Sequence, residues 1–193
     1  MRKGGGKSKG HHYELVIAEI FTKAFYPDND GIFRRTPLSG GWSKSVAPAD
    51  LIPFKFIKAS EQDTEAVIDS DFPFSVECKN HRDIKHFFTG LYASECEFFD
   101  WMKQSLDAAA INKKMPMVVF RLFRQNDICI LRNEDFVKLQ ELFGNTGCKD
   151  YLLKSNEWSL RFFLLKDVLN WIDWNTYKIM GHTKYIRSLI PKE

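Results

Sequence analysis

The chain has 193 residues, and 44% of them are hydrophobic, which suits a single domain with a sizeable core. Its 28 Lys and Arg residues barely outnumber its 25 Asp and Glu residues, which excludes a generic polycation, so any contact with nucleic acid must come from local clusters. No apolar run of 18 residues exists and the N-terminus lacks the apolar segment of a signal peptide, so we expect neither a membrane-spanning nor a secreted protein.

The N-terminal segment is basic and rich in glycine. Residues 1–10 contain no acidic residue, which predicts a flexible basic arm that can contact phosphates. Apolar residues at helical spacing then predict a helix over residues 11–25, on which Glu14 and Glu19 are the acidic residues. The cations of the arm are Arg2, Lys3, Lys7 and Lys9.

Two short strands separated by a long loop are predicted next. Turn-forming residues at 26–31 precede a strand over residues 32–35, and a loop rich in Gly, Ser and Pro covers residues 36–48. The second strand, residues 51–57, carries Pro53 near its start or at a sheet edge.

A polar segment and a strongly apolar strand follow. Residues 58–71 are polar and acidic and predict a surface excursion. Residues 73–79 are mostly apolar and predict a strand, and residues 80–92 predict a loop or a broken helix.

The second half of the chain alternates helices and strands. Apolar residues at helical spacing predict a helix over residues 95–110, with Trp101 on its inner face. The elements that follow in chain order are strands over residues 117–123 and 128–131, a helix over 133–143, a hairpin of strands at 151–153 and 158–164, and a helix over 166–174. This alternation favours a mixed α/β (α+β) sheet.

Four cysteines occur, at positions 78, 96, 129 and 148, and none forms a CxxC pair, which argues against a zinc site. Cys78 and Cys129 lie in strand-like runs, where a free cysteine behaves as a small buried hydrophobic residue. We therefore expect reduced thiols, as in a cytoplasmic protein.

Three charged residues form the clearest chemical pattern. Glu77 lies in a strand too apolar for an ordinary exposed edge, so its carboxylate needs a charged partner or a metal ion. Lys79 points to the same face of that strand, because side chains alternate, and Asp50 is expected from a neighbouring strand. Two carboxylates can hold a hard cation such as Mg²⁺ or Mn²⁺, which makes Asp50 and Glu77 candidate metal ligands for phosphodiester hydrolysis. The alternative for Lys79 is a plain ion pair with Glu77.

The pattern Asp50…Glu77-Cys78-Lys79 resembles that of the PD-(D/E)XK nuclease superfamily. A stretch Arg-x-x-x-Ser-Gly precedes Asp50, and a helix and a strand follow the Glu-x-Lys strand, in an order similar to that of archaeal-type and phage Holliday-junction resolvases. The resemblance covers residues 7–123. It implies a restriction-endonuclease-like mixed β-sheet core flanked by helices over residues 11–130, with residues 131–193 as a C-terminal strand and helix extension packed on that core.

The chain also departs from this pattern. The segment between Asp50 and Glu77 is longer than in compact resolvases, and Leu15 follows Glu14 where the family helix often has an arginine. These differences concern which subfamily of the nucleases the chain resembles, more than its resemblance to nucleases as such.

Further site residues are implied by the resemblance. Glu14 matches the acidic helix residue of the family, which helps to hold a metal or its water shell, and Glu19 competes with it for that role. Ser39 is a secondary catalytic candidate. An ordinary surface loop is the alternative for the segment around Ser39. The candidates for contact with the DNA backbone, besides the basic arm, are Arg34, Arg35, Lys44, Arg82 and Gln104.

The leading hypothesis is a Mg²⁺- or Mn²⁺-dependent DNA endonuclease that resolves four-way junctions in the cytoplasm of a prokaryotic or phage-infected cell. The alternatives are another PD-(D/E)XK enzyme of DNA repair or restriction, and a nucleic-acid-binding module with an inactive site. Two symmetric cuts need two active sites, so we expect a homodimer. The aromatic stretches 98–101 and 158–164 are candidates for its interface, with plain core as the alternative.

Overall fold

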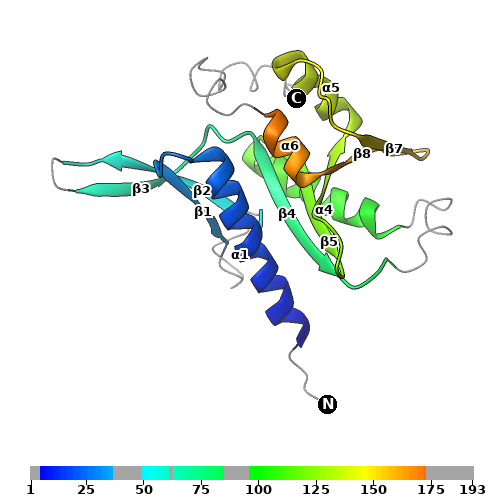
Figure 1. The fold of residues 1–193 in the computed structure, drawn as a ribbon, viewed down its shortest axis with the longest axis horizontal. Coiled ribbons are helices and arrows are strands. Elements are labelled where there is room, and N and C mark those ends of the chain that lie inside the picture. The colour runs from blue at the N-terminus through cyan, green and yellow to red at the C-terminus, as the bar shows by residue number, and fades with distance from the viewer. Residues whose placement is uncertain (1–4, 37–48, 61–62, 85–95, 173–193) are drawn as a thin grey trace.

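The computed structural model describes residues 5–36, 49–60, 63–84 and 96–172 (Figure 1). The helices are α1 (Gly5–Phe25), α4 (Glu97–Asn112), α5 (Asn133–Phe143) and α6 (Leu165–Trp171). The strands are β1 (Gly31–Arg35), β2 (Leu51–Lys58), β3 (Thr64–Ile68), β4 (Phe74–His81), β5 (Met115–Leu122), β6 (Ile128–Arg132), β7 (Asp150–Lys154) and β8 (Ser159–Leu164).

The strands form two sheets. One has the order β1-β2-β3 and the other β4-β5-β6-β8-β7. Within the larger sheet β4 and β5 run parallel while the other neighbours are antiparallel, so the sheet is mixed, as predicted. Figure 1 shows the β2–β3 hairpin projecting away from the larger sheet. This is the mixed α+β, restriction-endonuclease-like architecture that the sequence led us to expect.

Helices cover both faces of the five-stranded sheet. On one face, α1, α5 and α6 bury the apolar side chains of a first core cluster, which includes Val76 and Cys78 of β4. On the other face, α4 buries a second cluster with Val118 and Phe120 of β5. The strand β4 thus lies between two helical layers, and its alternating side chains enter both.

The element boundaries agree closely with the sequence except in two places. Helix α1 begins at Gly5, so residues 5–10 of the expected flexible arm are helical. The polar segment over residues 58–71 contains the strand β3, which pairs antiparallel with β2. Its side chains are mostly exposed, so the segment lacks the apolar alternation by which a half-buried strand is recognised.

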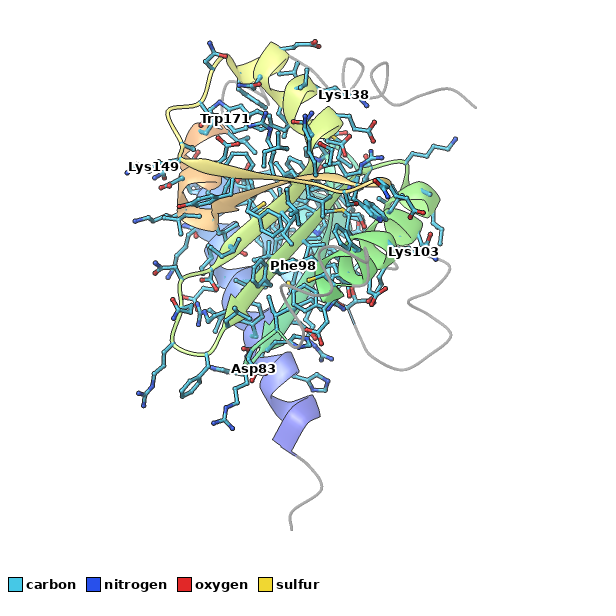
Figure 2. All side chains as sticks on the ribbon, turned by 90° about the vertical axis from the view of Figure 1, so that its right-hand side faces the viewer. Asp83, Phe98, Lys103, Lys138, Lys149 and Trp171 are labelled. Carbon is cyan, nitrogen blue, oxygen red and sulfur yellow. The ribbon has the colours of Figure 1, made fainter. Side chains whose placement is uncertain are left out.

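The aromatic stretches suggested for a dimer interface lie in the core instead. Phe98, Phe99 and Trp101 are buried, and Figure 2 shows Phe98 among the side chains in the middle of the molecule. Phe98 packs against Phe162 of β8 with ring centroids 5.0 Å apart. The aromatic residues of these stretches therefore pack against each other within one chain.

The segment after residue 130 contributes to the same sheet. Strand β8 pairs with β6, and β7 pairs with β8, so two of the five strands come from this segment. The cysteines are all free thiols, and Cys78, Cys96 and Cys129 are buried, as expected for the two strand positions. None of the helices in the described ranges is long and apolar enough to cross a membrane.

Candidate active site

The strand β4 divides its side chains between the core and a polar site. Val76 and Cys78 enter the core that α1 covers. Glu77 and Lys79 point the opposite way, and the Lys79 Nζ donates to Glu77 Oε1 at 2.6 Å. The side chain of Glu77 is only 3% exposed and that of Lys79 is 17% exposed. A carboxylate buried to this extent needs a compensating charge, which Lys79 supplies.

Asp50 reaches the same place from a different sheet. It lies in the bend just before β2 and does not belong to a neighbouring strand of β4, which corrects the expectation from the sequence. Two hydrogen bonds fix it: its backbone N–H donates to the carbonyl of Val76 at 3.0 Å, and the Cys78 N–H donates to Asp50 Oδ2 at 2.7 Å. The edge of β4 that lacks a strand partner therefore holds the Asp50 carboxylate.

Burial shapes the protonation of the two carboxylates. It raises the pKa of Asp50 to about 7, and the neighbouring charge of Glu77 adds to this rise. Burial also raises the pKa of Glu77, against which the Lys79 ammonium acts. Two carboxylates this close compete for ionisation, so the site favours either a shared proton or a bound cation.

The donor set fits a hard divalent cation. Side chains alone do not complete a site, because no group of three His, Cys, Asp or Glu residues arranged for a metal ion occurs in the described ranges. The Val76 carbonyl already accepts the N–H of Asp50. The Cys78 carbonyl lies on the same edge of β4, because the N–H and C=O of one strand residue point to the same side. Two carboxylates, one carbonyl and several waters suit Mg²⁺, which usually keeps part of its water shell.

Glu14, and not Glu19, borders this site. Glu14 of α1 is 12% exposed and accepts from the Nε of Arg35, and its charge adds to the raised pKa of both Asp50 and Glu77. Glu19 is 67% exposed and pairs with Lys23 one helical turn away. Arg35, expected at the DNA backbone, thus turns inward, and its Nη2 is buried with no hydrogen-bond partner among the residues that the structure describes.

These two helix carboxylates form a matched pair for mutagenesis. Replacing Glu14 by Gln should slow metal-dependent DNA cleavage by about 10- to 100-fold, because it removes a charge beside the two carboxylates that we expect to hold the metal. Glu19→Gln, on the same helix, should cleave at the wild-type rate. Initial rates over a Mg²⁺ titration would compare the variants, and equal rates for both would exclude Glu14 from the site.

Gln104 joins the site from α4. Lys79 Nζ donates to Gln104 Oε1 at 2.8 Å, so the ammonium group lies between Glu77 and Gln104. Helix α4 is amphipathic and packs its apolar side on β4 and β5, which brings Gln104 beside β4. The amide oxygen therefore orients Lys79 toward the carboxylates.

The other candidates for DNA contact are dispersed. Arg34 is exposed and its guanidinium lies 5.4 Å from the ring of Phe54, and Arg82 is exposed just after β4. Lys7 and Lys9 lie in the first turns of α1. Outside the described residues lie Arg2, Lys3, Ser39 and Lys44.

One polar residue of this face was missed from the sequence. His81 continues the alternation of Glu77 and Lys79 on β4 and contacts Trp101 of α4. The strand was predicted to end at residue 79, and its extension by two residues would have placed His81 on the same face.

The comparisons with known proteins point to one family. A family model described as "Phage putative PDDEXK endonuclease" matches residues 5–175, which is most of the chain. Neither the curated proteins nor the solved structures contain a match.

Proposed function

Because the chain belongs to the phage PDDEXK endonuclease family, we propose that it is a divalent-metal-dependent DNA endonuclease selective for branched DNA, a Holliday-junction resolvase. The observation that carries the catalytic part is the convergence of Asp50, Glu77 and Lys79 at one edge of β4. Glu77 and Lys79 come from β4 of the larger sheet, and Asp50 comes from the bend before β2 of the smaller sheet.

Each residue has a defined task in this proposal. Asp50 and Glu77 hold the cation, Mg²⁺ or Mn²⁺, through carboxylate oxygens. When bound, such a cation polarises a phosphoryl oxygen and lowers the pKa of a coordinated water. The Lys79 ammonium, steered by Gln104, neutralises charge that develops on the phosphate or orients the attacking water. Glu14 and Arg35 form a second ion pair beside the metal-binding carboxylates.

The proposed selectivity for branched DNA is supported by the Arg-x-x-x-Ser-Gly stretch that begins at Arg35, which is similar to a stretch of Holliday-junction resolvases. In this protein Arg35 contacts Glu14, which links that stretch to the catalytic carboxylates. Resolution of a four-way junction needs two cuts related by two-fold symmetry, and one chain supplies one site. We therefore propose a C₂ homodimer, which would act on DNA in the cytoplasm of the infected cell.

A panel of DNA substrates tests this proposal. With Mg²⁺ or Mn²⁺, a four-way junction should be cut in symmetric pairs, faster than a flap, a linear duplex or a single strand of the same sequence. EDTA should stop the reaction, and Ca²⁺ should support binding with little turnover, because its looser coordination positions the water poorly.

The outcomes separate the hypotheses. A monomer that nicks linear duplex as fast as the junction would remove the resolvase assignment and leave another PD-(D/E)XK endonuclease of repair or restriction. DNA binding without cleavage under any divalent cation would instead indicate an inactive nucleic-acid-binding module.

A further inference from the structure

Two rows of side chains run side by side where α4 crosses β4. Glu77, Lys79 and His81 lie on one face of the strand at every second position. Glu97, Trp101 and Gln104 lie on one face of α4, at helical positions i, i+4 and i+7. Lys79 contacts Gln104, and His81 contacts both Trp101 and Glu97. The row of side chains that contains Glu77 and Lys79 therefore extends to His81 at the end of β4.

The ring of His81 is held in place. Its centroid lies 4.7 Å from that of Trp101, with 43° between the ring planes. Trp101 is itself anchored in the core, with ring centroids 5.5 Å from both Phe98 and Phe120. A fixed aromatic surface under an imidazole reduces the conformational entropy that the side chain loses when it binds a ligand.

One ring nitrogen of His81 lies near a carboxylate. Nδ1 is 3.9 Å from Glu97 Oε2, a buried oxygen with no hydrogen-bond partner among the described residues. The side chain of His81 is 38% exposed, compared with 17% for that of Lys79, so the imidazole ring is accessible to a ligand.

We propose that His81 is a DNA-binding residue whose Nε2–H contacts a phosphate next to the scissile one. The inference rests on the proposed nuclease function. Along a strand, two residues advance by about 7 Å, so His81 is displaced from Lys79 far enough to meet a different phosphate of the same DNA strand. An imidazole N–H donates to phosphate oxygen, and phosphate contacts fix the register of a nuclease on DNA. Trp101, which packs against the His81 ring, and Glu97, whose carboxylate lies near Nδ1, are positioning residues in this proposal.

A cation follows His81 in the chain. Arg82 is exposed at the end of β4 and is available to an anionic backbone, beside the exposed acidic residue Asp83, which Figure 2 labels. Helix α1, which carries Lys7 and Lys9, covers the opposite face of β4.

A variant that keeps the ring but loses its donors tests the proposal. His81→Phe retains the packing on Trp101 and should weaken binding of a fluorescent DNA in Ca²⁺ by about tenfold, as expected for a lost hydrogen bond to a charged group. His81→Gln restores an N–H donor and should recover most of the affinity. In Mg²⁺, KM should rise for His81→Phe while kcat stays within about twofold, and the melting temperature should match that of the wild type.

A double-mutant cycle tests the positioning role of Glu97. Glu97→Gln should raise KM in the wild-type background and have no further effect in the His81→Phe background, because both changes act through one contact. Additive effects would show that Glu97 does not act through His81. If His81→Phe binds DNA as tightly as the wild type in Ca²⁺, the proposal is wrong.

The binding experiment in Ca²⁺ needs no turnover, which keeps the two proposals distinct. A wild-type protein that never cleaves but binds DNA in a His81-dependent way would overturn the nuclease function and retain His81 as a DNA contact. If the wild type cleaves DNA and His81→Phe binds and cleaves DNA like the wild type, the nuclease function stands and the His81 proposal is wrong. A protein that binds no DNA would overturn both.

Discussion

Replacing Glu77 by Gln should abolish metal-dependent DNA cleavage, with a loss of about 10³-fold or more in the single-turnover rate. The carboxylate is 3% exposed and lies between Asp50 and Lys79, so in the proposed function a neutral amide removes one of the two anionic metal ligands. A metal ion supplies several kcal/mol of transition-state stabilisation, and each 1.36 kcal/mol corresponds to a tenfold change in rate. DNA affinity should change little, because in the proposed function Glu77 binds the metal ion and not the DNA backbone.

A second buried carboxylate provides the control. Asp135 of α5 is 1% exposed and accepts from Arg132 at 2.6 and 3.0 Å, on a helix that packs against β6 and β8. Asp135→Asn should lower the melting temperature and leave the cleavage rate per folded molecule unchanged. Cleavage by Glu77→Gln at the wild-type rate, or an equal loss in Asp135→Asn, would contradict the assignment of the site.

The second large effect concerns pH. Without metal, Asp50 has a pKa of about 7, whereas an aspartate in the unfolded chain titrates near 3.9. The folded protein therefore binds more protons between these values, and its stability falls as the pH rises from about 4 to about 7. A divalent cation must displace the proton, so its apparent affinity should rise by about tenfold per pH unit up to pH 7 for each proton released. We expect the increase in melting temperature caused by Mn²⁺ to be small at pH 5.5 and large at pH 8.

Asp50→Asn provides the matching variant for this titration. It removes the titrating group, so the metal-free variant should lose less stability as the pH rises. At pH 8 its free energy of unfolding should exceed that of the metal-free wild type by at most a few kcal/mol. Mn²⁺ should no longer raise its melting temperature appreciably at any pH. Thermal denaturation with and without EDTA at four pH values measures both effects. A Mn²⁺ effect that is the same at pH 5.5 and pH 8 would contradict the raised pKa of Asp50 as the cause.

Local patterns in the sequence determined most of the elements and half of the site. Apolar periodicity located α4, β5, β6, α5, β8 and the strand β4 to within a few residues, because the face that an element buries is encoded in its own spacing. The same alternation placed Glu77 and Lys79 on one face of β4, opposite Val76 and Cys78. The strand β3 was missed because it is mostly exposed and carries no such periodicity.

Only the tertiary structure decided which of these faces meet. Asp50 approaches β4 from the end of a separate sheet through backbone hydrogen bonds, which leave no trace in side-chain spacing. Glu14 was distinguished from Glu19 by the packing of α1, which turns one carboxylate toward Arg35 and leaves the other in solvent. Likewise, α4 packs across β4 and β5, and only this packing brings Gln104 to Lys79 and Trp101 to His81. Periodicity specifies the orientation of a residue within its own element, whereas the partners of that element follow from long-range packing that a local pattern does not contain.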